Sequence, residues 1–297
     1  MFDIAIIGGG TAGLTAAIYG ARAGKNVAVF ESTAVGGQIL NSSAIDNYPA
    51  LPHISGLAFG QSLEKQARDL AVTFIFEEVS GIVGDFGDFR ISTEDGEYHA
   101  KTLILACGTI PRKLGLANEA RFEGRGVSYC ATCDGAFFKG KTVAVYGGGD
   151  TALHEANYLA DVATKVYVIN RSSKLRANPQ LITGAKQRDN IDFWLDAEIV
   201  DLLGESHLEE VVLKDGRKLS VSALFVAIGR VPFGSRLIAG LDLDEHGFVC
   251  ARSDCKTKLK GGFVAGDLRT KELRQLVTAS ADGAVAATAA VDLLNLA

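Results

Sequence analysis

The chain has 297 residues and a formal net charge of −5, and 47% of its residues are hydrophobic and 22% charged. This length is enough for about two domains, and the composition excludes a largely disordered chain. No basic block supports nucleic-acid binding, and no uninterrupted apolar run predicts a membrane span. Five cysteines without a disulfide framework favour a reducing, cytoplasmic compartment, where a C-x-x-C motif binds metal or is catalytic more often than it is structural.

The N-terminal residues predict a nucleotide-binding βαβ unit rather than a signal peptide. A short apolar strand at residues 3–8 leads into the turn GGGTAG, an alanine-rich helix runs to about residue 23, and a second strand ends at Glu31. Such glycines let the backbone approach a pyrophosphate at the helix N-terminus, and a carboxylate at the end of the second strand binds ribose hydroxyls. The candidate cofactor-binding residues here are Gly8, Gly10, Thr11, Ala12, Gly13 and Glu31.

A C-x-x-C motif lies in the stretch SYCATCDGAFF, where Cys130 and Cys133 are followed directly by Asp134. Such a pair belongs to a zinc site, to a structural disulfide or to a redox couple. A zinc site needs four ligands, but the other cysteines are scattered and the five histidines show no paired spacing. We therefore expect no metal and favour a redox couple, which needs a source of electrons.

Residues 141–171 repeat the N-terminal pattern directly after the redox motif. KTVAVYG is the expected strand, GGGDTA the turn, residues 151–159 the helix and TKVYVIN the next strand. That strand ends in Asn170-Arg171 with Lys174 and Arg176 close behind, and cations at this place suit the 2′-phosphate of NADP. The alternative is that these cations only form a solvated surface. The candidate nucleotide-binding residues are Gly147, Gly149, Asp150, Thr151, Ala152, Arg171 and Arg176.

Two dinucleotide-binding folds and one C-x-x-C indicate a flavoprotein that passes electrons from a nicotinamide to a disulfide. At this point the chain resembles the low-molecular-weight, bacterial-type thioredoxin reductases, which are FAD-containing pyridine nucleotide-disulfide oxidoreductases. Besides GGGTAG, CATCDG and GGGDTA, the shared motifs are GGQ at residues 36–38, DNYPA around Asn47, an altered ACGT at 106–109, AIG at 227–229, and FVAGD followed by RQ. The resemblance implies that FAD is bound by the first βαβ unit together with Gly37, Gln38, Asn47, Gly266, Asp267, Arg274 and Gln275.

The resemblance also implies an architecture. The fold class is α/β, with two Rossmann-like domains: an FAD domain of residues 1–112 and 241–297, and an inserted nicotinamide domain of residues 113–240 that carries the C-x-x-C motif. Hinges are expected around residues 109–111 and 233–239, and in the family the inserted domain moves between two poses during catalysis. Similar enzymes are homodimers.

Roles for individual side chains follow from the same resemblance. Cys133 receives electrons from the flavin, and Cys130 attacks the disulfide of thioredoxin or of a thioredoxin-like protein. Asp134 is expected to shuttle a proton, or else to cap a turn. Phe137 and Phe138 are either core aromatics or anchors of the docking surface for thioredoxin.

The electron donor is where the chain departs from the family. NADPH-using relatives carry H-R-R-x-x-F-R-A after the second strand of the nicotinamide domain, whereas residues 170–177 here read NRSSKLRA. Ser172 replaces the middle arginine, which removes a phosphate contact of about 1.5–3 kcal/mol. His154 stands where the family has glutamate, and Phe233 where it has asparagine. NADPH is the expected donor, with NADH or reduced ferredoxin as alternatives.

Other functional classes fit the motifs less well. An FAD-dependent dithiol oxidase acting on a small molecule is the second alternative, although such enzymes usually lack the nicotinamide turn. A peroxiredoxin-reducing relative carries a further N-terminal domain, and a flavoprotein without a dithiol step leaves the C-x-x-C unexplained. Cys107 is expected to be a small buried hydrophobe, and Cys250 and Cys255 to lie in a loop or hairpin rather than to form a second redox pair.

Overall fold

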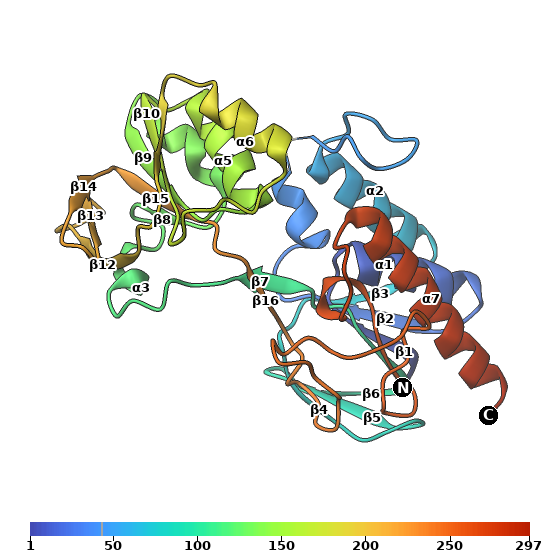
Figure 1. The fold of residues 1–297 in the computed structure, drawn as a ribbon. Coiled ribbons are helices and arrows are strands. Elements are labelled where there is room, and N and C mark those ends of the chain that lie inside the picture. The colour runs from blue at the N-terminus through green and yellow to red at the C-terminus, as the bar shows by residue number, and fades with distance from the viewer. Residues whose placement is uncertain (43) are drawn as a thin grey trace. The chain divides into compact units, whose positions relative to one another are not determined.

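Residues 1–42 and 44–297 are described by a computed structural model, in which the chain divides into two units. Unit 1 comprises Met1–Ile110 and Val231–Ala297, and unit 2 comprises Pro111–Arg230. The two ends of the chain, blue and red in Figure 1, therefore belong to the same unit. The chain passes between the units through β7 (Thr109–Pro111) and β16 (Arg230–Pro232), which pair with each other in a two-stranded sheet.

The second boundary between the units lies earlier than the sequence predicted. We expected the inserted domain to continue to residue 240, with a hinge at residues 233–239, but the division falls after Arg230. The amide of Ile82 donates to the carbonyl oxygen of Leu237 (2.7 Å), and Ile238 is buried in the core of unit 1. Burial of these apolar side chains holds the segment in unit 1, so the division lies about ten residues before the expected boundary, and the hinge at this end stays a prediction.

The sheet of unit 1 has seven strands, ordered β3-β2-β1-β6-β5-β4, with β17 also paired to β6. β6 has room for two partners on one side, because its first residues pair with antiparallel β5 and its last residues with parallel β17. The parallel strands β1, β2, β3, β6 and β17 therefore end at one edge of the sheet. The strands are β1 (Phe2–Ile7), β2 (Val27–Phe30), β3 (Thr73–Ile75), β4 (Val79–Val83), β5 (Phe89–Thr93), β6 (Glu97–Leu105) and β17 (Gly262–Val264).

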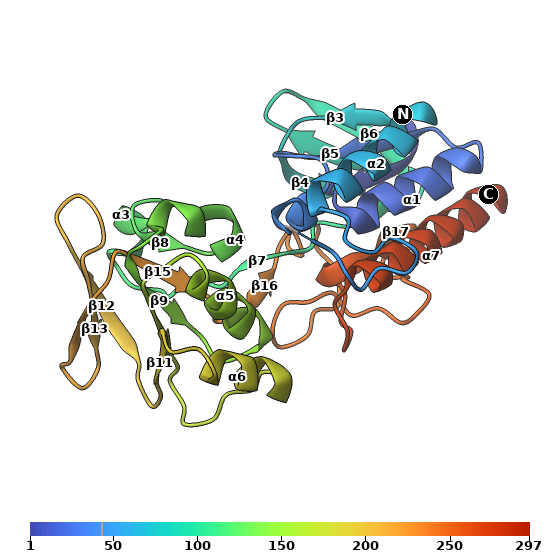
Figure 2. The ribbon, with the colours of Figure 1, turned by 90° about the horizontal axis from the view of Figure 1, so that it is seen from above.

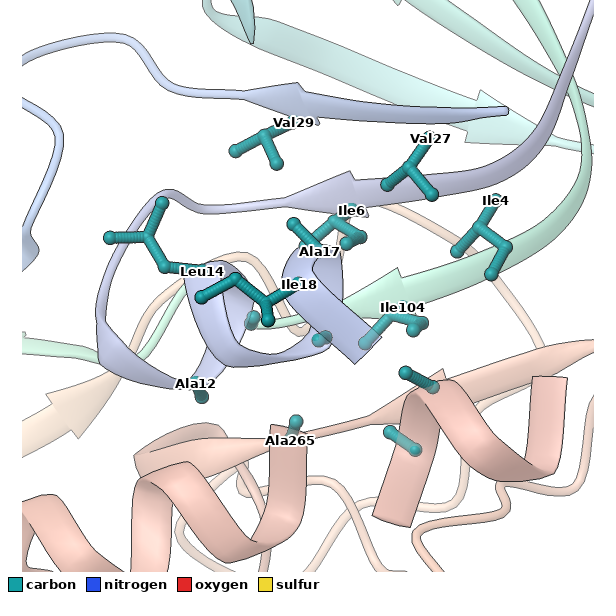
Figure 3. Close-up of a cluster of buried hydrophobic side chains, with 14 of the residues drawn as sticks. Ile4, Ile6, Ala12, Leu14, Ala17, Ile18, Val27, Val29, Ile104 and Ala265 are labelled. Atoms are coloured by element: carbon teal, nitrogen blue, oxygen red, sulfur yellow. The ribbon is translucent and has the colours of Figure 1, made fainter. Parts of the chain in front are cut away.

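Helices α1 and α7 pack against each other in unit 1, and Figures 1 and 2 show them side by side. The contact is close because small residues meet: a Cβ atom added at Gly283 of α7 would lie 2.2 Å from the carbonyl oxygen of Ala12 in α1. Figure 3 shows Leu14 and Ile18 of α1 in the same cluster as apolar residues of β1 and β2. The helical segments of the unit are α1 (Thr11–Arg22), η1 (Gly37–Asn41), α2 (Gly56–Asp69), η3 (Gly266–Leu268) and α7 (Leu276–Asn295).

Helix α7 is long and apolar enough to cross a membrane by length and composition alone, with a mean hydropathy of 1.3. Polar residues interrupt the helix, so α7 does not contradict the expectation that the chain has no uninterrupted apolar run of this length. The helix carries two aspartates, and its alanine-rich face lies in the core of unit 1 against α1. This packing accounts for its composition, because a helix that faces a core and another helix needs small apolar residues on more than one side.

Unit 2 is built around an all-parallel sheet ordered β11-β10-β9-β15-β8, with a separate antiparallel sheet β12-β13-β14. The strands are β8 (Val127–Ser128), β9 (Thr142–Tyr146), β10 (Lys165–Ile169), β11 (Ile191–Trp194), β12 (Ile199–Leu203), β13 (Glu210–Leu213), β14 (Lys218–Ser220) and β15 (Ala223–Val226). The helices are α3 (Glu119–Phe122), α4 (Ala131–Asp134), η2 (Gly135–Phe138), α5 (Asp150–Ala160) and α6 (Pro179–Lys186). Both predicted βαβ units are confirmed as β1-α1-β2 and β9-α5-β10, and the fold is α/β with two Rossmann-like units.

Candidate active site

The first glycine turn lies at the carboxyl edge of the sheet in unit 1, between β1 and α1. Gly8 has a φ of +108°, and a Cβ atom there would lie 2.5 Å from the carbonyl oxygen of Ala106, which follows β6. A Cβ atom at Gly13 would lie 1.9 Å from the carbonyl oxygen of Gly8, so neither position tolerates another residue. No side chain caps the N-terminus of α1 at Gly10. Its first amide groups are therefore available to an anion such as a pyrophosphate.

Glu31 lies where the sequence predicted a ribose-binding acid. Its Oε2 accepts a hydrogen bond from the amide of Gly9 (2.8 Å), and its Oε1 accepts bonds from the amide and the hydroxyl of Thr33 (both 2.9 Å). The carboxylate is thus held at the end of β2 beside the glycine turn. This position fits the adenosine half of FAD, whose ribose presents hydroxyl donors.

Flavin-motif residues that are far apart in the sequence come together in unit 1. The side chain of Gln38 donates to the carbonyl oxygen of Thr109 (2.6 Å), and the amide of Asn47 donates to Oε1 of Gln275 (2.9 Å). Gly37 has a φ of +66°, and its neighbour in the GGQ motif forms a β-bridge to the glycine turn. The structure therefore places the GGQ motif against the first glycine turn and Thr109, and it pairs Asn47 with Gln275.

Asp267 provides a direct test of whether the site fits a flavin cofactor. Its Oδ1 atom is buried and has no hydrogen-bond partner, and the ammonium group of Lys271 is 3.7 Å away. The preceding Gly266 approaches the start of α1 so closely that a Cβ atom there would lie 2.8 Å from Cβ of Ala12. A buried acceptor without a donor is costly. A hydroxyl of a bound cofactor would satisfy it, so the residues present fit FAD.

Arg274 stabilises the loop that carries Asp267. Its guanidinium stacks over the ring of Phe248 at 4.2 Å, and its Nε donates to the carbonyl oxygen of Asp267 (3.2 Å). The side chain of Arg274, a predicted cofactor residue, therefore contacts the backbone of the flavin motif at Asp267.

A buried ion cluster that the sequence did not predict lies next to the Gly266 turn. Asp282 of α7 accepts hydrogen bonds from Arg269 (2.8 Å), Lys271 (3.0 Å) and the amide of Gly266 (3.1 Å). The three charged side chains are 7–13% exposed. An aspartate in the middle of the alanine-rich stretch TASADGAVAATAA was the available signal, because a carboxylate there needs a cationic partner.

The second glycine turn has the same construction in unit 2. Gly147 has a φ of +150°, and a Cβ atom there would lie 2.1 Å from the carbonyl oxygen of Ala227, just as Gly8 approaches Ala106. Gly149 begins α5 without a side-chain cap, and a Cβ atom there would meet no other atom within 4 Å. The residues present therefore fit the pyrophosphate of a nicotinamide nucleotide.

The remaining predicted residues of this turn occupy three different environments. Asp150 accepts a hydrogen bond from the amide of Asn178 (2.6 Å), so one of its oxygens joins α5 to the start of α6. Thr151 is exposed, and Ala152 is buried with its Cβ against Gly147.

Asn170 takes in unit 2 the place that Glu31 has in unit 1. A Cβ atom at Gly148 would lie 2.7 Å from Oδ1 of Asn170, as one at Gly9 would lie 3.3 Å from Oε2 of Glu31. The amide of Asn170 donates to the carbonyl oxygens of Ser172 (2.8 Å) and Lys174 (3.2 Å) and so shapes the following loop. An amide in place of the carboxylate removes the repulsion that an acid would exert on a 2′-phosphate.

The loop after Asn170 presents its cations beside the turn. The amide of Arg176 donates to the carbonyl oxygen of Gly148 (2.6 Å), which fixes the loop to the glycine turn. Arg171, Lys174 and Arg176 are exposed, and within the described part of the chain none of them pairs with a carboxylate. Ser172 donates to the carbonyl oxygen of Lys174 (3.0 Å) and thus stabilises the loop itself.

The C-x-x-C motif follows β8 and therefore lies at the same carboxyl edge of the parallel sheet as the second glycine turn. Cys130 and Cys133 form a disulfide with Cα atoms 5.4 Å apart. The amide of Cys133 donates to Sγ of Cys130 (3.3 Å). Cys130 is half-buried and Cys133 is exposed.

Asp134 is connected to the redox pair through Ser128 at the end of β8. The hydroxyl of Ser128 donates to Oδ2 of Asp134 (2.6 Å), and the amide of Cys130 donates to Oγ of Ser128 (3.1 Å). Ser128 therefore links the carboxylate of Asp134 to the backbone of Cys130.

Glu155 of α5 is a second acid at the redox motif, and the sequence analysis did not select it. Its Oε1 accepts a hydrogen bond from the amide of Ala131, between the two cysteines (3.4 Å), and its Oε2 is buried without a partner. Burial raises the pKa of Glu155 to about 7, against the hydrogen bond of Ala131 and the positive charge of Arg230. No spacing rule marks this residue, because β9 and the glycine turn separate it from the cysteines in the chain.

The two aromatic residues after the redox motif have different roles. Phe138 packs edge-to-face on Phe225 in the core of unit 2, with ring centroids 5.9 Å apart. Phe137 is 80% exposed on the same segment. Phe138 is therefore a core aromatic, whereas Phe137 lies outside the core and its docking role stays a prediction.

The three other cysteines are free. Cys107 is half-buried against the core of unit 1, donates to the carbonyl oxygen of Ile7 (3.3 Å), and has a pKa raised to about 12 by burial. Cys255 is fully buried with a pKa raised to about 12, also by burial, whereas Cys250 is exposed. The pair forms no disulfide, and both lie outside helices and strands as predicted.

Comparison with known proteins identifies the family. The model of the pyridine nucleotide-disulphide oxidoreductases matches residues 2–283. The thioredoxin reductase of Treponema pallidum is 39% identical, with 99% of this chain and 97% of that protein covered. The crystal structure of Lactococcus lactis thioredoxin reductase (FR conformation) has a TM-score of 0.93 at 34% identity and covers all of both chains. A ferredoxin-flavin thioredoxin reductase structure from Clostridium acetobutylicum has a TM-score of 0.57 at 31% identity, with 100% of this chain and 99% of that chain covered.

These matches span the chain from end to end, and they agree with the two nucleotide folds and the disulfide-bonded C-x-x-C described above. The chain therefore belongs to the pyridine nucleotide-disulphide oxidoreductase family and, within it, to the thioredoxin reductases, which are flavin-dependent disulfide oxidoreductases.

Proposed function

We propose that this enzyme transfers electrons from NADPH, through FAD, to the Cys130–Cys133 disulfide and from there to the disulfide of thioredoxin or a thioredoxin-like protein. The observation that carries this proposal is the position of the disulfide: it lies at the same sheet edge as the nicotinamide turn, on a segment that is half-buried and exposed rather than enclosed in the core. The flavin residues lie in unit 1 and the redox pair in unit 2, so catalysis requires that the units bring the two sites together.

FAD would be held by the α1 turn, Glu31, Gln38, the Asn47–Gln275 pair and Asp267. When bound, it supplies the conversion of hydride chemistry into thiol chemistry. The buried Oδ1 of Asp267 would accept a hydrogen bond from the cofactor and thereby orient it. The α1 amides would neutralise part of the pyrophosphate charge.

The chain's own residues would then act on the substrate disulfide in a defined order. Cys133 would receive the electrons from the flavin, and Cys130 would be the nucleophile that attacks the substrate disulfide to form a mixed disulfide, which Cys133 resolves. Asp134 would supply or remove the proton of the departing thiol, and Ser128 holds its carboxylate beside the backbone of Cys130.

NADPH is the donor best supported by the loop after β10. Asn170 replaces the acid that would repel a 2′-phosphate, and Arg171, Lys174 and Arg176 are exposed beside the turn. NADH and reduced ferredoxin stay as alternative donors for two reasons. Position 172 is a serine, so the phosphate contact of the family's arginine is absent, and one structural relative is named a ferredoxin-flavin thioredoxin reductase.

The donor is tested by an anaerobic titration of the flavin absorbance with NADPH, NADH and reduced ferredoxin in separate runs. Bleaching by micromolar NADPH, with weaker bleaching by NADH, supports the proposal. If ferredoxin alone bleaches the flavin, the second glycine turn has lost its role and the NADPH proposal is refuted.

Charge changes in the loop after β10 test whether this loop binds the 2′-phosphate of NADPH. Arg176→Ala is expected to raise the KM for NADPH about tenfold or more, because a charge-assisted hydrogen bond to phosphate is lost, and to leave the KM for NADH unchanged. Ser172→Arg is expected to lower the KM for NADPH. Steady-state kinetics with both nucleotides measure these effects, and Lys218→Ala on β14 is the control. Equal changes for NADPH and NADH would show that the loop does not bind the 2′-phosphate.

Phe137 is the proposed anchor for the protein substrate. Phe137→Ala is expected to raise the KM for thioredoxin about tenfold, because an exposed aromatic beside the redox pair loses its contact area. The rate with a small disulfide such as dithionitrobenzoate should not change. Phe76→Ala, an exposed aromatic of unit 1, is the control. A KM for thioredoxin that Phe137→Ala leaves unaltered would rule out this anchor.

We further propose that the enzyme is a cytoplasmic homodimer. Apart from the redox disulfide, the chain has three cysteines, all of them free, and this favours a reducing compartment. Val277, Val285 and Leu296 of the α7 region are exposed apolar residues of the kind that a subunit interface covers. The dithiol oxidase alternative is not favoured by the glycine turn, which retains every feature needed for a nucleotide.

A further inference from the structure

The redox motif has a second acid that the proposed reaction does not yet use. Glu155 extends from α5, which packs against α4, and contacts the backbone between Cys130 and Cys133 through the amide of Ala131 (3.4 Å). Asp134 follows Cys133 directly, and its carboxylate is linked to the amide of Cys130 through the hydroxyl of Ser128 on β8. Two carboxyl groups on different elements thus border one disulfide.

The environment of Glu155 allows it to carry a proton at neutral pH. Its Oε2 is buried and lacks a hydrogen-bond partner, which disfavours the ionised form. Because burial raises its pKa to about 7, the carboxyl is protonated below that pH and ionised above it while the disulfide is intact. An ordinary glutamate would be ionised throughout this range.

The charges around Glu155 determine whether its pKa rises or falls when the redox pair is reduced. The positive charge of Arg230 lowers the pKa of Glu155. The other titratable groups on α5 and on the elements packed against it are Asp134, Tyr146, Asp150, His154, Tyr158, Lys165, Tyr167 and Lys186, and none of them is among the causes of the raised pKa of Glu155. No other carboxylate affects the pKa of Glu155, and a thiolate formed at the neighbouring redox pair would raise it, because a nearby negative charge disfavours the ionised carboxyl.

We propose that Glu155 is a proton-holding group of the redox site, whose carboxyl takes up a proton when Cys130–Cys133 is reduced and releases it when the pair is oxidised. On reduction the S–S bond breaks and two electrons enter the sulfur pair from the reductant. One of the two accompanying protons stays on a sulfur, and the other goes to Glu155 and leaves one sulfur as a thiolate. On oxidation by a substrate disulfide, the two electrons leave with the reduced substrate and Glu155 returns its proton.

This inference rests on the proposed redox role of the Cys130–Cys133 pair, but it requires neither NADPH nor thioredoxin. The first test is an infrared difference spectrum of the full-length holoenzyme at pH 7.5, before and after reduction by dithiothreitol. A protonated-carboxyl band should grow on reduction, disappear in Glu155→Gln, and persist in Asp134→Asn and in Glu209→Gln, which changes an exposed acid of unit 2. A band that persists in Glu155→Gln, or that vanishes in Asp134→Asn, would overturn the proposal.

The second test measures the thiol directly. In the single-cysteine variants Cys133→Ser and Cys130→Ser, the rate of alkylation by iodoacetamide is followed against pH, with and without Glu155→Gln. Removing the neighbouring charge should lower the apparent pKa of the more strongly coupled thiol by about one unit. Unchanged midpoints for both thiols would refute the coupling. A holoenzyme that fails to turn over thioredoxin but shows both effects would refute the proposed substrate and leave this inference intact.

Discussion

Replacing either Cys130 or Cys133 by serine is expected to reduce thioredoxin reduction at least about a thousandfold. The hydroxyl that remains is neither a nucleophile at neutral pH nor able to form a disulfide, so the exchange step has no substitute group. Reduction of the flavin by the nucleotide should persist in both variants, because it does not require the dithiol. Stopped-flow flavin absorbance and a coupled insulin-reduction assay separate the two half-reactions.

The two cysteine variants also distinguish the roles of the sulfurs. With Cys130 as the attacking sulfur, Cys133→Ser should form a stable mixed disulfide with thioredoxin, and Cys130→Ser should not. Non-reducing gels followed by mass spectrometry identify the adduct. Cys250→Ser removes an exposed free cysteine and serves as the control, with full turnover expected. Retention of disulfide reductase activity in Cys130→Ser and Cys133→Ser would disprove the redox couple.

Replacing Asp282 by asparagine is expected to destabilise unit 1 by about 3–5 kcal/mol. The substitution leaves the buried cations Arg269 and Lys271 without their carboxylate, and uncompensated buried charges are costly. For a unit of this size the loss corresponds to a Tm lower by roughly 10 °C. Because the same carboxylate accepts from the amide of Gly266, the flavin content after purification should also fall.

A control on the same helix isolates this effect. Asp292→Asn removes an exposed acid of α7 and should leave the Tm within about 2 °C of the parent. Thermal unfolding followed by circular dichroism and by flavin fluorescence measures both variants. If Asp282→Asn has the same Tm and the same flavin content as the parent, the ion cluster contributes neither to the stability of the fold nor to flavin binding at the Gly266 turn.

The two nucleotide folds were predictable because their signals are local. Strand, glycine turn and helix follow each other within about 25 residues, and the glycines are needed for backbone approaches that no other residue permits, as at Gly13 and Gly147. The redox pair is equally local, since two residues separate its sulfurs. The division of the chain differs from the predicted boundary at residue 240 for the opposite reason. It depends on the burial of Leu237 and Ile238 against residues about 150 positions away, as in the bond from Ile82.

The parts of the candidate site that the sequence missed all depend on distant contacts. Asp282 pairs with Arg269 and Lys271 in a preceding loop, and Glu155 accepts from a backbone amide more than twenty residues earlier. For Phe137 and Phe138 the sequence offered two roles, and only packing against Phe225 showed that Phe138 belongs to the core and Phe137 does not. Burial is a property of the folded chain, so composition and spacing do not report it.

By itself, the sequence determined that this protein has two dinucleotide-binding units and a redox C-x-x-C, because glycine turns, short apolar strands and paired cysteines are chemical requirements visible in consecutive residues. Only the tertiary structure decided that the disulfide shares a sheet edge with the nicotinamide turn, that Asn170 packs against Gly148 of that turn, and that a buried glutamate borders the redox motif. The physical reason is that parallel strand order, burial and the electrostatics of buried groups arise from contacts between segments far apart in the chain.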